Sequence, residues 1–164
     1  MNHRIEKMDA FRIVGVKLRS TNENMQGMKD IPAFWGEVMS QKKQMQILPL
    51  MNAAPMGLLG VSVYNSDAND AKVFDYYIAC ATTKATPEGM EEYTVPAATW
   101  AVFPCKKEEM GHVQMDIFTQ WMPTSGYRGL NSGYETGAMN SAAPDIELYT
   151  QGDDVEIWVP VENA

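Results

Sequence analysis

The stretch APDIELYTQGDDVEIWVPVE, residues 143–162, decides the fold class. Two runs rich in β-branched and large apolar residues flank the short polar segment QGDD, and this arrangement predicts a β-hairpin. Glu147 lies in the middle of the first run, between Ile146 and Leu148. An aliphatic residue would make a better strand, so the question is which face of the sheet carries this carboxylate and what it meets there.

Pairing across the hairpin suggests an answer. If residues 151–154 form the turn, Glu147 lies opposite Trp158 and Tyr149 lies opposite Glu156. One face of the hairpin is then aliphatic, and the other is mixed. The simplest interpretation of the mixed face is a solvated sheet surface. The alternative is a binding wall, because a cation over a Trp or Tyr ring gains about 0.5–2 kcal/mol.

The pattern strand, helix, strand, strand occurs twice along the chain. The first copy is expected at residues 11–20, 31–45, 57–65 and 72–82, and the second at residues 99–105, 112–122 and in the hairpin. The sequence therefore predicts a single α+β domain, residues 1–164, built from two pseudo-symmetric βαββ repeats of about 8–82 and about 92–161. These repeats are expected to form one antiparallel sheet that carries two helices and a central ligand groove.

The two copies differ at one informative position. Aligning them sets Val61-Ser62-Val63-Tyr64 beside Ile146-Glu147-Leu148-Tyr149, so that Ser62 stands where the second copy has Glu147. This asymmetry places the expected function in the second half.

Three more tryptophans are candidates for the groove. Trp35 and Trp121 lie on the apolar stripes of the two expected helices, and Trp100 lies in a strand. Core packing is the commoner role for a tryptophan at such a position. Together with Glu147, Tyr149 and Trp158, they complete the set of expected ligand-binding residues.

Composition narrows the function classes. The formal net charge is −8, and the short basic run Lys106-Lys107 is followed at once by two glutamates, which argues against direct nucleic-acid binding. A negative surface favours cationic ligands. No segment approaches the length of a membrane span and no signal peptide is recognisable, so a cytoplasmic protein is expected.

Metal and cofactor chemistry has little support in the sequence. Cys80 and Cys105 form no CxxC pair and are expected to be free thiols, while His3 and His112 belong to no ligand motif. We therefore expect no metal and no cofactor. The glycines of residues 124–142 fit no phosphate-binding pattern, and this stretch is expected to be a loop near the groove.

Several short motifs, taken in order, resemble a known family. YTVPAATWAVFPC, QWMPTSGY, PDIELY and DVEIWVPV are similar to the GyrI-like effector-binding domain. This domain is the ligand-binding part of multidrug-responsive transcription regulators of the AraC and MerR types and also occurs in a stand-alone form. The resemblance implies a duplicated βαββ domain that binds bulky, apolar and often cationic compounds, with a strand glutamate facing the ligand. Glu147 is the matching residue.

Three functions remain open from the sequence. The first is a stand-alone binding module for apolar cations, which acts as a sensor or a sequestering protein. The second is a hydrolase of small reactive compounds, in which Glu147 is the general base and Tyr149 donates a hydrogen bond. The third, implied by the resemblance, is an acidic partner protein that modulates DNA gyrase. The expected partner of the first is a small cationic amphipathic molecule, with no nucleic acid and no membrane.

Overall fold

The computed structural model of the chain describes residues 1–131 and 141–164, and strands dominate these residues. The strands are β1 Arg4–Met8, β2 Phe11–Thr21, β3 Leu58–Val63, β4 Val73–Ala81, β5 Glu91–Val95, β6 Ala98–Lys106, β7 Tyr127–Gly129, β8 Asp145–Tyr149 and β9 Asp154–Asn163. The helices are α1 Gly27–Ser40, α2 Gln44–Ile47 and α3 Met110–Asp116, and a π-helical turn, Ile117–Trp121, continues α3. Short 3-10 turns lie at Glu23–Met25, Leu48–Leu50, Lys107–Glu109 and Met122–Thr124.

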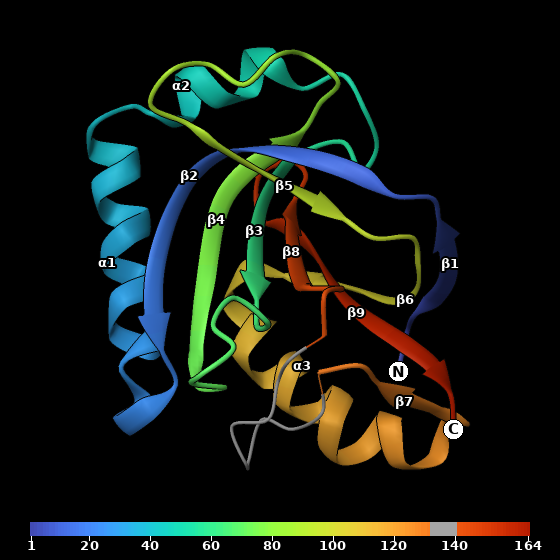
Figure 1. Cartoon of the computed structure of the whole chain (residues 1–164). Coiled ribbons are helices and arrows are strands. Elements are labelled where there is room, and N and C mark those ends of the chain that lie inside the picture. The colour runs from blue at the N-terminus through green and yellow to red at the C-terminus, as the bar shows by residue number, and fades with distance from the viewer. Residues whose placement is uncertain (132–140) are drawn as a thin grey trace.

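All nine described strands belong to one antiparallel sheet (Figure 1). Its order is β1-β6-β9-β8-β3-β4-β2-β5, and β7 pairs with β9 beside this path. The two strands in the middle, β8 and β3, pair with each other, and equivalent strands follow outward from them on both sides. The predicted α+β fold with two pseudo-symmetric repeats in one sheet is therefore confirmed.

The two halves also exchange their edge strands. β1 pairs with β6 of the second half, and β5 pairs with β2 of the first half. Both strands are short and rich in charged residues, RIEKM and EEYTV, which is why no strand was predicted there. Because each repeat supplies the outer strand of the other, its full order is strand, strand, helix, strand, strand.

One face of the sheet carries the helices. Directly opposed residues share a face, and one row of such residues crosses five strands from Ile78 through Gly60, Glu147 and Ile157 to Phe103. At one end of this row, Ile78 packs in a cluster with Val38 of α1. At the other end, Phe103 and Ile157 pack with Ile117 and Trp121 of the α3 segment. The centre of the row therefore lies between the two helical layers.

The opposite face carries a separate core to which no described helix contributes. Leu59, Val61, Ile146 and Leu148 of the central strands belong to it, together with Trp158. Figure 1 shows that the sheet bends strongly, with β2 arching across it toward β1. The curvature lets strands near the two ends of the sheet help enclose these apolar side chains.

The predicted register of the hairpin is wrong by one residue. In the structure Glu147 pairs with Ile157 and Ile146 pairs with Trp158, so Glu147 and Trp158 lie on opposite faces. Thr150 pairs with Asp154, which leaves a loop of Gln151, Gly152 and Asp153 instead of the expected four-residue turn. Gly152 adopts a positive φ of 58° as the first central residue of the turn that the hydrogen bond from Asp154 N–H to the Gln151 carbonyl closes, a conformation that glycine adopts readily.

The helices also differ from the expected ranges. α1 begins four residues earlier than predicted and ends at Ser40, because Lys42 takes a positive φ of 57° before α2 starts. Residues 132–140 of the expected glycine-rich loop lie outside the described residues, whereas β7, within the same stretch, is a strand. No helix in the described part of the chain is long and apolar enough to cross a membrane.

Candidate functional site

Glu147 lies at the centre of the helix-bearing face, where the two halves of the sheet meet. Its cross-strand neighbours are Gly60 on β3 and Ile157 on β9. The side chain remains partly exposed to solvent although protein atoms surround it closely. This strand can accommodate an acid because the carboxylate points away from the aliphatic core of the other face and keeps some contact with solvent.

Two side chains donate hydrogen bonds to the carboxylate. The hydroxyl of Tyr149 donates to Oε2 at 2.6 Å, and Nε2 of Gln114, from α3, donates to Oε1 at 3.3 Å. Each carboxylate oxygen can accept more than one hydrogen bond. The described partners therefore leave acceptor capacity on Glu147 for a ligand.

The first half of the chain approaches the same carboxylate with aromatic rings. The indole nitrogen of Trp35, from α1, donates a hydrogen bond of 2.8 Å to the hydroxyl of Tyr76. The Trp35 ring also meets the Tyr149 ring edge to face, with 4.9 Å between the ring centroids. Trp35 thus joins α1 to β4 and β8 beside Glu147.

Gly60 makes this arrangement possible. A Cβ atom at this position would lie 2.2 Å from the Tyr76 hydroxyl and 3.5 Å from Oε2 of Glu147. The missing side chain leaves room for the hydroxyl of Tyr76 near the carboxylate.

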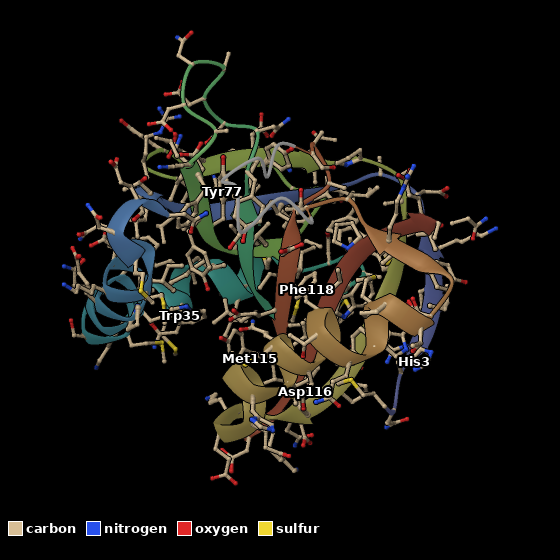
Figure 2. All side chains as sticks on the ribbon, turned by 90° about the horizontal axis from the view of Figure 1, so that it is seen from below. His3, Trp35, Tyr77, Met115, Asp116 and Phe118 are labelled. Carbon is tan, nitrogen blue, oxygen red and sulfur yellow. The ribbon has the colours of Figure 1, made fainter. Side chains whose placement is uncertain are left out.

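The outer surface of the helices adds exposed apolar side chains. Figure 2 shows Trp35 carried by α1, Met115 carried by α3 and Phe118 carried by the π-helical turn that continues α3. Met115 is 66% exposed and Phe118 is 38% exposed, so packing against the core covers neither side chain completely. Large apolar side chains left in water on two neighbouring elements can contact an apolar ligand.

Burial dominates the electrostatics of the site. It raises the pKa of Glu147, and the hydrogen bonds from Tyr149 and Gln114 oppose this rise only partly. Burial also raises the pKa values of the Tyr76 and Tyr149 hydroxyls, and the negative charge of Glu147 raises them further. Both hydroxyls therefore stay protonated and can donate hydrogen bonds.

Glu147 has no ion pair with any described residue. Two other acids that are at least half-buried, Glu156 and Asp75, have one. Glu156 accepts two hydrogen bonds from Arg4, at 2.7 and 3.0 Å, and Asp75 pairs with Arg19 at 3.0 Å. A described cation does lie near the site, since Nζ of Lys107 is 5.7 Å from the centroid of the Tyr149 ring, but it forms no ion pair with Glu147.

The structure brings together only part of the expected set. Tyr149 contacts both Glu147, through its hydroxyl, and Trp35, through its ring. Trp158 and Trp100 lie on the other face, buried and with their rings in edge-to-face contact at 5.8 Å. Trp121 lies beneath the α3 segment, where its ring meets Phe103 at 4.9 Å.

Sequence reasoning missed several neighbours of Glu147. Tyr76, Gly60 and Gln114 come from three different elements, and no short motif connects them to the hairpin. Asp145, two residues before Glu147 on the same strand face, was also missed, although strand alternation alone places it there.

Two surface depressions lie elsewhere. The first is lined by residues near the start of β2 and of the segments near 53 and 82–85, and the second by residues 104–106, 109, 150 and 154–156 around Cys105. Neither includes Glu147, where Trp35 and Tyr149 are in contact, so an open groove over the carboxylate stays a prediction. Within the described residues, no three potential ligands gather to hold a metal ion.

Comparison with known proteins identifies the family. A model of integron-associated effector-binding proteins, named Cass2, matches residues 4–161. The chain belongs to this family. No curated protein sequence matches it significantly.

Solved structures share the fold of this family member at low sequence identity. SAV2435 bound to tetraphenylphosphonium has a TM-score of 0.81 at 19% identity and covers 99% of this chain and 94% of its own. A putative transcription regulation protein from Staphylococcus aureus MU50 has a TM-score of 0.74 at 20% identity, with 99% of both chains covered. The C-terminal domain of EcmrR has a TM-score of 0.59 at 15% identity, with 99% and 98% covered. The fold confirms the resemblance to GyrI-like effector-binding domains.

Proposed function

We propose that the protein is a stand-alone binding module for bulky, apolar cations and that Glu147 supplies the counter-charge. The observation that carries this proposal is the unpaired carboxylate of Glu147 at the centre of the helix-bearing face. On binding its ligand, the protein either sequesters it or passes a signal to another chain.

Charge compensation gives the proposal its energetic basis. Burying an ionised carboxylate without a partner costs several kcal/mol in the low-dielectric interior, typically about 3–5 kcal/mol when one member of a pair is missing. A ligand that brings a positive charge removes this penalty when it binds. A neutral ligand of the same shape does not, so the site selects for charge.

Aromatic and flexible apolar side chains support the same reading. The rings of Trp35 and Tyr149 lie next to the carboxylate, and a desolvated cation over such a ring gains about 2 kcal/mol. Met115 on α3 and Phe118 on the π-helical turn that follows it offer exposed apolar area. Methionine adapts to ligands of different shape because its side chain is unbranched and polarizable.

The comparison with SAV2435 supports the ligand class. That protein, which shares the fold, was solved with tetraphenylphosphonium, a bulky apolar cation. The same compound is therefore the first probe to use on this chain.

Titration calorimetry tests the proposal. Tetraphenylphosphonium should bind the unmodified protein, and Glu147→Gln should weaken binding by roughly 30-fold or more, since the attraction between two unit charges roughly 6–8 Å apart at an effective dielectric constant of about 20 is about 2–3 kcal/mol. Triphenylphosphine oxide, which keeps the phenyl rings but has no net charge, should bind both proteins weakly and equally.

Glu156→Gln is the matched control. It makes the same change on the neighbouring strand, but Glu156 lies on the opposite face and pairs with Arg4. Its affinity for tetraphenylphosphonium should equal that of the unmodified protein. Equal affinity in Glu147→Gln as well would refute the role of Glu147.

A second candidate function, hydrolysis, is favoured by the hydrogen bond between Tyr149 and Glu147. A carboxylate whose pKa is raised by burial can act as a general base on a bound water molecule. Product formation from an added reactive ester or cyclic compound, lost in Glu147→Gln, would support it. A protein that binds cations without consuming any such compound would exclude it as the main activity.

A further inference from the structure

A second carboxylate shares the face and the strand of Glu147. Asp145 lies two residues earlier on β8, so its side chain points to the same side of the sheet. Its cross-strand neighbour on β3 is Ser62, as Gly60 is the neighbour of Glu147. Two residues along a strand span roughly 6.6–6.8 Å, which sets the spacing of the two acids.

The surroundings of Asp145 contain hydrogen-bond donors but no described cation. Nδ2 of Asn131 donates to Oδ1 at 3.1 Å, and Asn131 is itself fixed by a hydrogen bond of 2.8 Å to the carbonyl of Ala143. Among the described residues, the ionisable groups that face Asp145 are Glu147 on its own strand and Tyr64, directly after β3. Neither supplies a positive charge.

A more deeply buried aspartate, in contrast, has a cationic partner. Asp75, 7% exposed, forms an ion pair of 3.0 Å with Arg19. Asp145 has no ion pair with any described residue, and its nearest ionisable neighbour on the strand is a second acid. Among the described residues, the two carboxylates at the centre of the sheet therefore have no ion-pair partner.

The hydroxyl of Tyr76 provides a further observation at the same place. Tyr76 is 1% exposed and accepts a hydrogen bond from Trp35, but its own proton has no acceptor among the described residues. It lies near Oε2 of Glu147 across Gly60. A buried donor without an acceptor is costly, and a ligand in this space can provide one or reorient it.

We propose that Asp145 is a second charge-recognising residue of the same site, so that the protein prefers rigid aromatic dications whose two positive centres match the spacing of Asp145 and Glu147. This inference rests on the proposed function and specifies its ligand class. A monocation compensates one acid only, whereas a dication compensates both.

Protonation provides the alternative way to neutralise Asp145. Burial, together with the nearby charge of Glu147, raises the pKa of Asp145 to about 7, although the hydrogen bond from Asn131 opposes the rise. At pH 8 the free protein therefore carries the second negative charge, and at pH 6 a proton replaces it. The preference for dications should be large at pH 8 and small at pH 6.

A matched pair of probes tests the inference by titration calorimetry. The dication is 1,1′-dibenzyl-4,4′-bipyridinium, whose charged nitrogens lie at opposite ends of two joined rings. The monocation is 1-benzyl-4-(4-benzylphenyl)pyridinium, which keeps the two joined rings and both benzyl groups but has a single charge. Both are titrated into the unmodified protein, Asp145→Asn and Glu147→Gln at pH 6 and pH 8.

The unmodified protein should bind the dication at least ~10-fold more tightly than the monocation at pH 8. The reason is that the second positive charge adds an attraction to Asp145, in a site whose effective dielectric constant lies between those of water and dry protein. At pH 6 the ratio should fall toward the factor of two expected from a ligand with two equivalent ends. Asp145→Asn should show the low ratio at both pH values and keep its affinity for the monocation.

The outcomes separate this inference from the proposed function. If the monocation binds but the dication is not preferred at pH 8, Asp145 does not recognise charge and the proposed function stands. If neither cation binds the unmodified protein, the proposed function fails as well. Because the pH dependence of the unmodified protein tests the inference without a substitution, an Asp145→Asn protein that failed to fold would not prevent the decision.

Discussion

The two central strands of the sheet, β3 and β8, occupy equivalent places in the two repeats but differ in charge. On the helix-bearing face, β8 presents Asp145 and Glu147, whereas β3 presents Ser62 and Gly60 directly opposite them. The backbone obeys the symmetry of a duplicated chain, but the ionisable side chains do not. The comparison shows that one repeat supplies the acids while the other provides space and aromatic neighbours.

The aromatic contribution of the first half is equally specific. Trp35 of α1 and Tyr76 of β4 are joined by a hydrogen bond and lie beside the acids of the second half. In the second half the helix tryptophan, Trp121, packs into the core beneath α3 instead. The site is therefore a composite of two unlike halves, and each difference between them can be tested.

The largest expected effect on stability comes from removing the charge of Asp145. The ordinary pKa of an aspartate is 3.8, and in the folded protein the pKa of Asp145 is about 7. Between these values the folded state holds a proton that the unfolded state has released, so stability falls as the pH rises through this window. Asp145→Asn should therefore raise the free energy of unfolding at pH 8, by at most about 4 kcal/mol.

The same substitution should have little effect at pH 4, where Asp145 is protonated in the folded protein. Urea unfolding of both proteins at pH 4 and pH 8 measures the difference. An equal change in stability at the two pH values would show that Asp145 does not carry an uncompensated charge. The strands β8 and β3 would then differ only in the charge of Glu147.

A smaller effect is expected from filling the space on β3. Gly60→Ala places a methyl group where the Tyr76 hydroxyl lies 2.2 Å away, so Tyr76 must move. Overpacking of this kind costs about 1–3 kcal/mol, which thermal unfolding would detect. Tetraphenylphosphonium affinity should fall with it, because Tyr76 and Trp35 lose their positions.

Gly36→Ala is the control for this substitution. No atom lies within 4 Å of the added methyl group at this position in α1, and the change should stabilise the helix by up to about 1 kcal/mol. An unchanged stability and affinity in Gly60→Ala would mean that the gap on β3 has no role in the site.

The smallest effect should come from Trp35→Phe. The substitution keeps an aromatic ring but removes the hydrogen bond to Tyr76, a loss of about 1 kcal/mol in stability. It should also remove most of the tryptophan fluorescence change caused by tetraphenylphosphonium, since Trp100 and Trp158 lie on the other face. Trp121→Phe should retain that change. The opposite result would mean that the ligand lies near Trp121 and not near Trp35.

Much of the fold could be predicted because it depends on local patterns. The alternation in residues 143–162 gave the hairpin, and the repeated order of strands and helices gave the two halves. The edge strands could not be predicted, because β1 and β5 are short and charged and gain their place only by pairing with the other repeat. Such long-range exchange leaves no local signal.

The acid of the site could be predicted, but its neighbours could not. A glutamate between aliphatic residues in a strand is unusual enough to mark Glu147 from sequence alone. The error over Trp158 came from the loop, since three residues instead of four reverse the face of every residue in the partner strand. Tyr76 and Gln114 reach Glu147 from β4 and α3, and their contribution depends on how those elements pack.

A crystal structure of the protein with tetraphenylphosphonium tests the central claim most directly. The account predicts that the phosphonium lies on the helix-bearing face between α1 and α3, with a phenyl ring against Trp35 or Tyr149 and with the carboxylate of Glu147 as the nearest acid. A phosphonium in one of the two surface depressions away from Glu147, or on the face of Trp100 and Trp158, would contradict it.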